Sequence, residues 1–217
     1  MPYQAVLFDL DGTLLDTLED IGNAMNRVLE TRGFPTHPID VYRSFVGDGM
    51  VMLVTRALPK NKRDDETIHA CLEVYRADYR RNWNIKTKPY DGVAALLDAL
   101  TARGLKRAIL SNKPHEFTQR CVTELLPNQS FDVVLGQRDG VPLKPDPTGA
   151  LEIAHTLGIP PAAFLYLGDT PVDMQTAIAA DMVPVGVIWG FRTAEELGSS
   201  GAQALIERPL EVLEFLD

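Results

Sequence analysis

Two aspartates, Asp9 and Asp11, stand directly after the short apolar run of residues 5–8. In an extended chain, side chains two residues apart point to the same side. Clustered carboxylates repel each other unless a cation lies between them, and oxygen ligands of this kind suit Mg²⁺. Gly12 then lets the backbone turn away. The sequence therefore predicts a magnesium site at the end of the first strand.

A hydroxyl and an amide follow a second candidate strand. Ser111 and Asn112 come directly after the apolar residues 105–110 and before a segment with helical spacing. Polar groups at the start of a helix can contact phosphate oxygens, although the same pair is also a common helix cap. The position at a strand end favours a binding role.

A lysine and a second pair of aspartates complete the polar set. Lys144 lies in a loop whose prolines stiffen it and hold the ammonium in place. Asp169 follows the apolar residues 164–167, and Asp173 comes four residues later. Both can face one way across a first helical turn. With the first aspartate pair, they would complete an oxygen-rich Mg²⁺ site.

The elements that must position these groups alternate between strand and helix. Such alternation is typical of a parallel sheet with helical crossovers, whose ligands bind outside the carboxyl ends of the strands. Residues 18–85, in contrast, contain only helix-like spacing. We expect an α/β fold: a Rossmann-like parallel sheet core from residues 1–15 and 88–217, and a small α-helical domain inserted at residues 16–87.

Composition limits the class of partner. The 217 residues carry a formal net charge of −9, and the sequence pI is near 4.9. An acidic chain binds nucleic acid or anionic membranes poorly. A few local hydrogen-bond donors and one bound cation are nevertheless enough to bind a small phosphorylated metabolite. The start of the chain lacks a secretory signal, and no apolar run approaches the roughly 20 residues of a membrane span. We expect a cytoplasmic monomer or homodimer.

The polar groups occur in an order that resembles the four motifs of the haloacid dehalogenase-like (HAD) phosphohydrolases. The first motif is residues 8–17, and the likeness covers nearly the whole chain. It implies that Asp9 is a nucleophile that forms an aspartyl-phosphate. It also implies that Asp11 protonates the leaving alcohol and later takes a proton from the attacking water.

The resemblance divides the core residues into three sets by role. The catalytic set is Asp9, Asp11 and Lys144. The phosphate-binding set is Thr13, Ser111 and Asn112. The set of Mg²⁺ ligands is Asp9, Asp11, Asp169 and Asp173.

The helical insertion resembles the small cap domain of this family. Its length and its turn at residues 45–49 look most like the phosphoglycolate phosphatase-like branch, which implies 2-phosphoglycolate as substrate. If such a cap closes over the core, the backbone amides of Gly47 and Gly49 and the guanidinium of Arg56 are candidates for substrate contacts.

Two other functions use similar residues. A β-phosphoglucomutase-like mutase shares the core motifs, although such enzymes typically carry a histidine that residues 18–23 lack. A receiver-like domain, which accepts a phosphoryl group without turnover, also combines acids, a hydroxyl and a lysine on a parallel sheet, but it needs no helical insertion. The core residues would contact only the phosphate group of a substrate. They are therefore compatible with phosphoglycolate, pyrophosphate, sugar phosphates and nucleotides.

Overall fold

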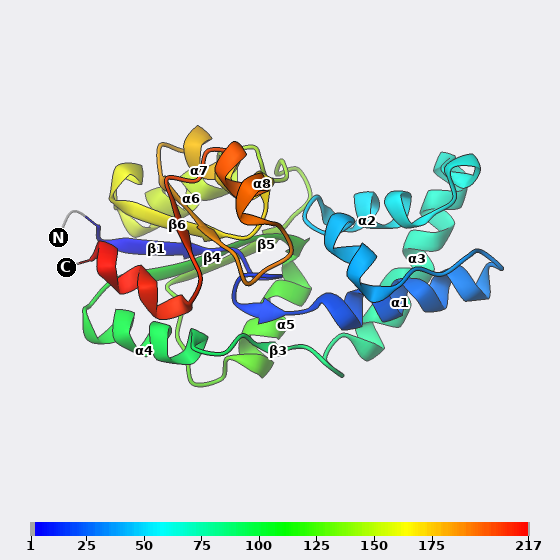
Figure 1. Ribbon diagram of the computed structural model, residues 1–217, viewed down its shortest axis with the longest axis horizontal. Helices are drawn as coiled ribbons and strands as arrows, with labels where there is room; N and C mark the ends of the chain where they lie inside the picture. Colours follow the sequence, from blue (N-terminus) through cyan, green and yellow to red (C-terminus); the bar gives the residue numbers. More distant parts are fainter. Residues whose placement is uncertain (1–2, 217) are drawn as a thin grey trace. The chain divides into compact units, whose positions relative to one another are not determined.

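The computed structural model describes residues 3–216, which fall into two compact units. The described parts of Met1–Leu15 and Pro89–Asp217 form the first, called the core unit here, and Asp16–Lys88 forms the second, the helical unit. The core unit is α/β, whereas the helical unit contains almost only helices (Figure 1). None of the helices in residues 3–216 is both long and apolar enough to cross a membrane.

A six-stranded parallel sheet forms the centre of the core unit, in the order β5-β4-β1-β6-β7-β8. The strands are β1 (Ala5–Phe8), β4 (Lys106–Pro114), β5 (Val133–Gln137), β6 (Phe164–Gly168), β7 (Val183–Val187) and β8 (Ala204–Ile206). All four residues of β1 are buried, as expected for an apolar strand with neighbours on both sides and helices on both faces. The predicted α/β fold with a Rossmann-like parallel core is confirmed.

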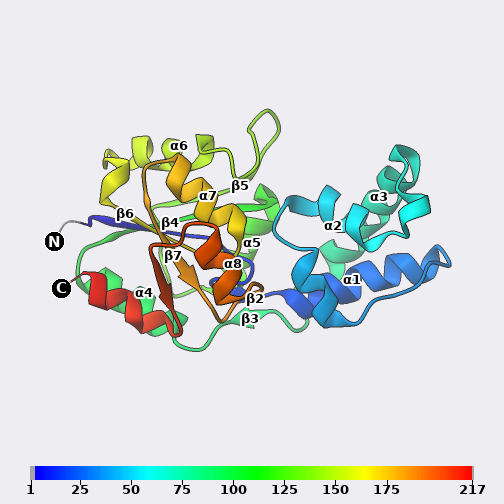
Figure 2. The same cartoon turned by 45° about the horizontal axis from the view of Figure 1, so that its top comes forward.

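Helices cover both faces of this sheet (Figures 1 and 2). On one face lie α4 (Val93–Ala102), α5 (His115–Leu125) and η4 (Pro209–Phe215). On the other lie α6 (Thr148–Leu157), α7 (Pro171–Ala179) and α8 (Ala194–Ser199), while the short η3 (Pro161–Ala163) leads into β6. Apolar side chains of the second layer, such as Ile153 and Ala177, pack with Leu7 and Leu110 of the sheet. This buried layer makes the strand ends a rigid platform.

The helical unit follows β1 and contains five helical segments. They are α1 (Leu18–Thr31), η1 (Ile39–Ser44), α2 (Gly49–Ala57), η2 (Lys60–Lys62) and α3 (Asp65–Asn82). A bidentate ion pair joins α1 to α3, with Arg27 Nη2 at 2.6 Å from Asp78 Oδ2. The predicted helical insertion between the first two long strands of the core is confirmed.

Asp20 fixes the end of the helical unit to its beginning. This buried carboxylate, in the first turn of α1, accepts from the backbone amides of Lys86 and Thr87 and from the Thr87 hydroxyl, each at 2.8 Å. The two-residue strands β2 (Leu15–Asp16) and β3 (Lys88–Pro89) form a separate small sheet where the chain enters and leaves this unit.

The strand β4 is longer than the apolar pattern predicts. The pattern ends the strand at Leu110, with a helix to follow, but the extended backbone continues to Pro114 after a register shift against β5. Ser111 and Asn112 therefore belong to the strand, and the prediction that they start a helix is wrong. A register shift of this kind interrupts the regular alternation of side chains along a strand.

Asp132 ties the start of β5 to β4, and its effect on stability should depend on pH. Its carboxylate accepts from Lys106 Nζ at 2.7 Å and from the Arg107 amide at 2.9 Å. Burial acts to raise the pKa of this carboxyl, but these two hydrogen bonds outweigh burial and hold the pKa below its ordinary value. We expect Asp132→Ala to lower the free energy of unfolding at pH 7 by about 1 kcal/mol.

Because the pKa is depressed in the folded state, this stabilisation is present above the unfolded-state pKa of roughly 3.9 and is lost as the pH falls through the folded-state value. Urea unfolding of the wild type and of Asp132→Ala between pH 7 and pH 3 measures this pH-dependent stabilisation. Lys106→Met is the control, because it removes one donor and leaves the Arg107 amide bond in place. A difference between wild type and Asp132→Ala that stays constant down to pH 3 would contradict the assignment.

Candidate active site

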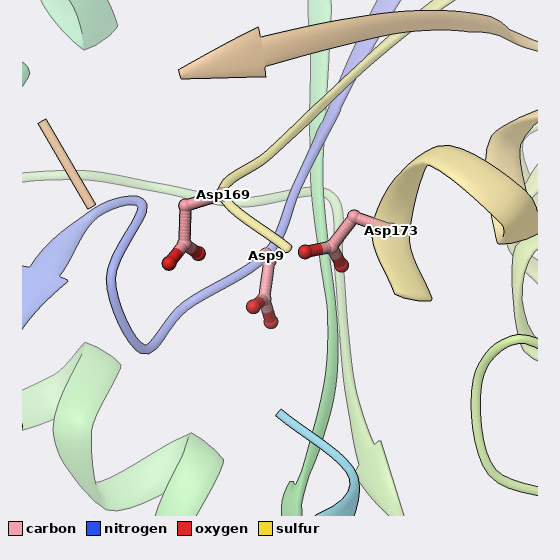
Figure 3. A group of neighbouring side chains, drawn as sticks. All are labelled: Asp9, Asp169 and Asp173. Carbon is pink, nitrogen blue, oxygen red and sulfur yellow. The ribbon is translucent and has the colours of Figure 1, made fainter. Parts of the chain in front are cut away.

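Three buried aspartates meet at the carboxyl edge of the sheet. Asp9 follows β1, Asp169 follows β6, and Asp173 lies in the first turn of α7. Each offers one carboxylate oxygen, and these oxygens lie within 4.8 Å of one another. Figure 3 shows Asp9 between the other two, with the carboxylates facing a shared space. The structure thus brings together three of the four aspartates that the sequence predicts as metal ligands.

Asp169 is held from two sides. Its Oδ1 accepts from the Thr13 hydroxyl at 2.9 Å, and its Oδ2 accepts from the backbone amide of Phe191 at 2.8 Å. Trp189 Nε1 in turn donates to the Thr13 carbonyl at 3.0 Å. Gly12 permits this approach, because a Cβ atom there would lie 2.2 Å from Asp169 Oδ2, and its φ is +89°. Thr13, predicted to contact phosphate, therefore also positions an aspartate.

Asp173 is both a helix cap and one half of an ion pair. Its Oδ2 accepts from the amide and the hydroxyl of Thr170, at 3.1 and 2.7 Å, in a capping box at the start of α7. Its Oδ1 accepts from Lys144 Nζ at 2.6 Å. One oxygen thus holds the helix start while the other faces the cluster.

Lys144 supplies a buried positive charge beside the aspartates. Its ammonium lies 2.6 Å from Asp173 Oδ1 and 3.0 Å from Asp9 Oδ1, and it also donates to the Leu110 carbonyl at 3.1 Å. Burial alone would lower the pKa of Lys144, but the attraction of Asp173 and Asp9 outweighs burial and keeps the pKa well above its ordinary value. The two ion pairs therefore favour the charged ammonium of Lys144.

Asn112 holds the Lys144 loop in place. Its Oδ1 accepts from the Lys144 amide at 2.9 Å, and its Nδ2 donates to the Lys144 carbonyl at 3.1 Å. The sequence predicts Asn112 as a phosphate ligand, whereas the structure gives its side chain this positioning contact. Ser111, on the same strand, is buried, and its hydroxyl accepts from the Lys113 amide at 3.3 Å.

The electrostatics of Asp9 favour a bound cation. Asp9 Oδ1 is buried and has no hydrogen-bond donor among residues 3–216, since its contact with Lys144 is an ion pair without hydrogen-bond geometry. Burial raises the pKa of Asp9 to about 7; Lys144 opposes this shift, and Asp173 and Asp11 add to it. Burial, together with Asp9 and Asp173, also raises the pKa of Asp169 well above its ordinary value.

The chemistry of the aspartate cluster suits a divalent metal ion. A buried oxygen without a donor, within a group of crowded carboxylates, is the kind of site that a divalent cation relieves by coordination. The ligands are hard oxygens, and none of the three is a sulfur or imidazole group. The donor set therefore fits Mg²⁺ better than zinc or copper.

The carboxylate of Asp11 lies apart from the other three and pairs with Lys113. Lys113 Nζ donates to Asp11 Oδ1 at 2.9 Å and to Oδ2 at 3.1 Å. The sequence predicts Asp11 as a metal ligand, but the structure places its carboxylate on this ammonium. No sequence pattern assigned a role to Lys113.

The predicted substrate contacts of the helical unit lie at one turn. Gly47 and Gly49 have φ values of +127° and +84°, which favour glycine. Arg56 Nη1 lies 2.6 Å from Asp48 Oδ2 and donates to the Phe45 carbonyl at 3.1 Å. Arg56 therefore closes this turn, and a role of the three residues in substrate binding stays a prediction.

The combination of four strand-end motifs and an inserted helical unit agrees with comparisons to known proteins. A family model described as haloacid dehalogenase-like hydrolase matches residues 6–187. The chain belongs to the haloacid dehalogenase-like hydrolases. The predicted family resemblance is confirmed, and the aspartate cluster at the sheet edge fits a metal site of this hydrolase family.

Curated members of the hydrolase family resemble the chain over nearly its full length. The phosphoglycolate phosphatase of Aquifex aeolicus (strain VF5) is 31% identical over 214 residues, which cover 99% of this chain and 97% of that protein. The phosphoglycolate phosphatase of Psychrobacter arcticus is 34% identical over 204 residues, which cover 91% and 88%.

Solved structures of such hydrolases have the same fold. A protein of Lactobacillus delbrueckii subsp. bulgaricus is 33% identical and superposes with a TM-score of 0.94, covering 100% of this chain and 99% of its own. A hydrolase from Pseudomonas syringae is 26% identical with a TM-score of 0.79, covering 99% and 98%.

Asp169→Asn should weaken Mg²⁺ binding, because a neutral amide replaces a buried carboxylate of the cluster. We expect the dissociation constant for Mg²⁺ to rise more than roughly tenfold. Titration calorimetry measures the constant, and thermal unfolding in Mg²⁺ and in EDTA gives a second measure, because a ligand stabilises the state that binds it. Asp139→Asn, in an exposed loop, is the matched control. Equal Mg²⁺ affinity in the two variants would place the metal elsewhere.

Proposed function

We propose that this hydrolase is a Mg²⁺-dependent phosphatase that cleaves a small phosphomonoester through an aspartyl-phosphate on Asp9, with 2-phosphoglycolate as its substrate. The observation that carries the proposal is the position of Asp9, whose buried carboxylate lies beside Lys144 and two further aspartates and has one oxygen without a donor. The two relatives named above, both phosphoglycolate phosphatases aligned over nearly the whole chain, support the choice of substrate.

The cation would be held by Asp9, Asp169 and Asp173. When bound, Mg²⁺ neutralises charge on the phosphoryl oxygens and orients them towards the nucleophile. Lys144 adds a fixed positive charge next to Asp9 and remains protonated throughout. The Ser111 hydroxyl is a candidate donor to the phosphate oxygens, whereas the hydroxyl hydrogen of Thr13 is already donated to Asp169.

The reaction proceeds in two displacements at phosphorus. Asp9 forms a bond to phosphorus as the bond to the leaving alkoxide breaks, and Asp11 gives its proton to that alkoxide. Asp11 then accepts a proton from a water molecule, whose oxygen attacks phosphorus. This second step releases inorganic phosphate and restores the carboxylate of Asp9.

Asp9→Asn tests the nucleophile. We expect the variant to lose more than about 10³-fold in kcat, since an amide cannot form the acyl phosphate. Its thermal stability without metal should equal or exceed that of wild type, because one of several repelling charges is gone. Phosphate release is measured with 2-phosphoglycolate, pyrophosphate, a sugar phosphate and a nucleotide, each in Mg²⁺ and in EDTA. Asp139→Asn again serves as the charge-matched control.

Several outcomes would defeat the proposal. Undiminished hydrolysis by Asp9→Asn would exclude this carboxylate as the nucleophile. Isomerisation of the sugar phosphate that exceeds phosphate release would indicate a mutase. Stoichiometric phosphorylation of the wild-type protein without further turnover would indicate a receiver-like acceptor.

A further inference from the structure

Lys113 is a second buried cation of the site, and the mechanism above does not use it. Its side chain is 4% exposed, and that of its partner Asp11 is 12% exposed. Nζ contacts both oxygens of the Asp11 carboxylate. A buried ammonium is costly unless it is paired, so an anion is needed at this place.

The position of Lys113 puts it beside the leaving group. Its ammonium pairs with Asp11, which follows β1, so it lies at the same carboxyl edge of the sheet as Ser111 at the end of β4. In the proposed reaction, Asp11 touches the ester oxygen of the substrate. Because the same Asp11 side chain also reaches Lys113 Nζ, the ammonium lies within the range that one aspartate carboxylate can span by rotation from that oxygen. A carboxylate attached one carbon from the ester oxygen falls within this range.

We propose that Lys113 recognises a carboxylate on the leaving group, and that Asp11 occupies the place of this carboxylate while the enzyme is free of substrate. The substrate carboxylate takes over the ammonium. Asp11, released from this ion pair, takes up a proton from solvent, turns to the ester oxygen and gives that proton to the leaving alkoxide. This inference rests on the proposed phosphatase function, and it makes a short phosphorylated 2-hydroxy acid the substrate class. An uncharged leaving group leaves Asp11 as the ionised partner of Lys113, so Asp11 has no proton to give to the leaving alkoxide.

The wild-type enzyme alone gives the first test. The two substrates are 2-phosphoglycolate and ethyl phosphate, which carries a methyl group in place of the carboxylate. We expect kcat/KM for 2-phosphoglycolate to be higher by roughly 100-fold, the size typical of a charged hydrogen bond in a buried site. Equal kcat/KM values for the two substrates would overturn the inference without contradicting the proposed phosphatase activity. Hydrolysis of neither substrate would defeat the proposed function, and the inference with it.

Lys113→Met gives the second test. We expect kcat/KM for 2-phosphoglycolate to fall roughly 100-fold, chiefly through KM, while the value for ethyl phosphate changes far less. Lys113→Arg, which keeps the charge, should retain part of the preference. Lys106→Met, which removes another lysine of β4 that is paired with an aspartate, should leave the preference unchanged. An equal loss on both substrates in Lys113→Met would mean that Lys113 only orients Asp11, and would overturn the inference.

Discussion

The charge balance between Lys144 and the aspartates is the interaction on which the rest of the site depends. One ammonium contacts both Asp9 and Asp173, while the donors to Asp169 among residues 3–216 are the neutral groups of Thr13 and Phe191. Three carboxylates with one cation leave an excess of negative charge in a buried space, where repulsion is weakly screened. Without a cation, this repulsion and burial favour the protonated forms of Asp9 and Asp169, whose pKa values are both raised. A divalent cation would convert the same repulsion into binding energy.

Close backbone approach is the second requirement of the site. A Cβ atom at Gly168 would lie 2.2 Å from Asp173 Cβ, and one at Gly190 would lie 2.3 Å from Asp169 Cβ. Together with Gly12, these glycines let three segments that are distant in sequence converge on one point. Any larger residue would push an aspartate away from its neighbours. The glycines are therefore part of the site although they supply no functional group.

The sequence predicted the fold class, because buried apolar runs such as residues 5–8 alternate with amphipathic helices. It missed α8, although Thr193 and Glu196 have the spacing of a capping box, because the helix is only six residues long. The sequence pattern also ended β4 at Leu110. A change from apolar to polar residues marks where an apolar run ends, but the backbone can stay extended beyond that point. The pairing of Asp11 with Lys113 depends on that extension, so residue types alone could not reveal it.

The place of β1 at the centre of the sheet also has a consequence for the order of assembly. Ala5 pairs with Lys106 on one side and with Phe164 on the other, so its two neighbours emerge from the ribosome long after it does. Contacts over such sequence separations form slowly, because a long loop must close before they are made. During synthesis, β1 and the Asp9 that follows it remain without their neighbouring strands. A delay in translation within residues 9–105 would lengthen the period in which that strand is open to aggregation or to chaperones.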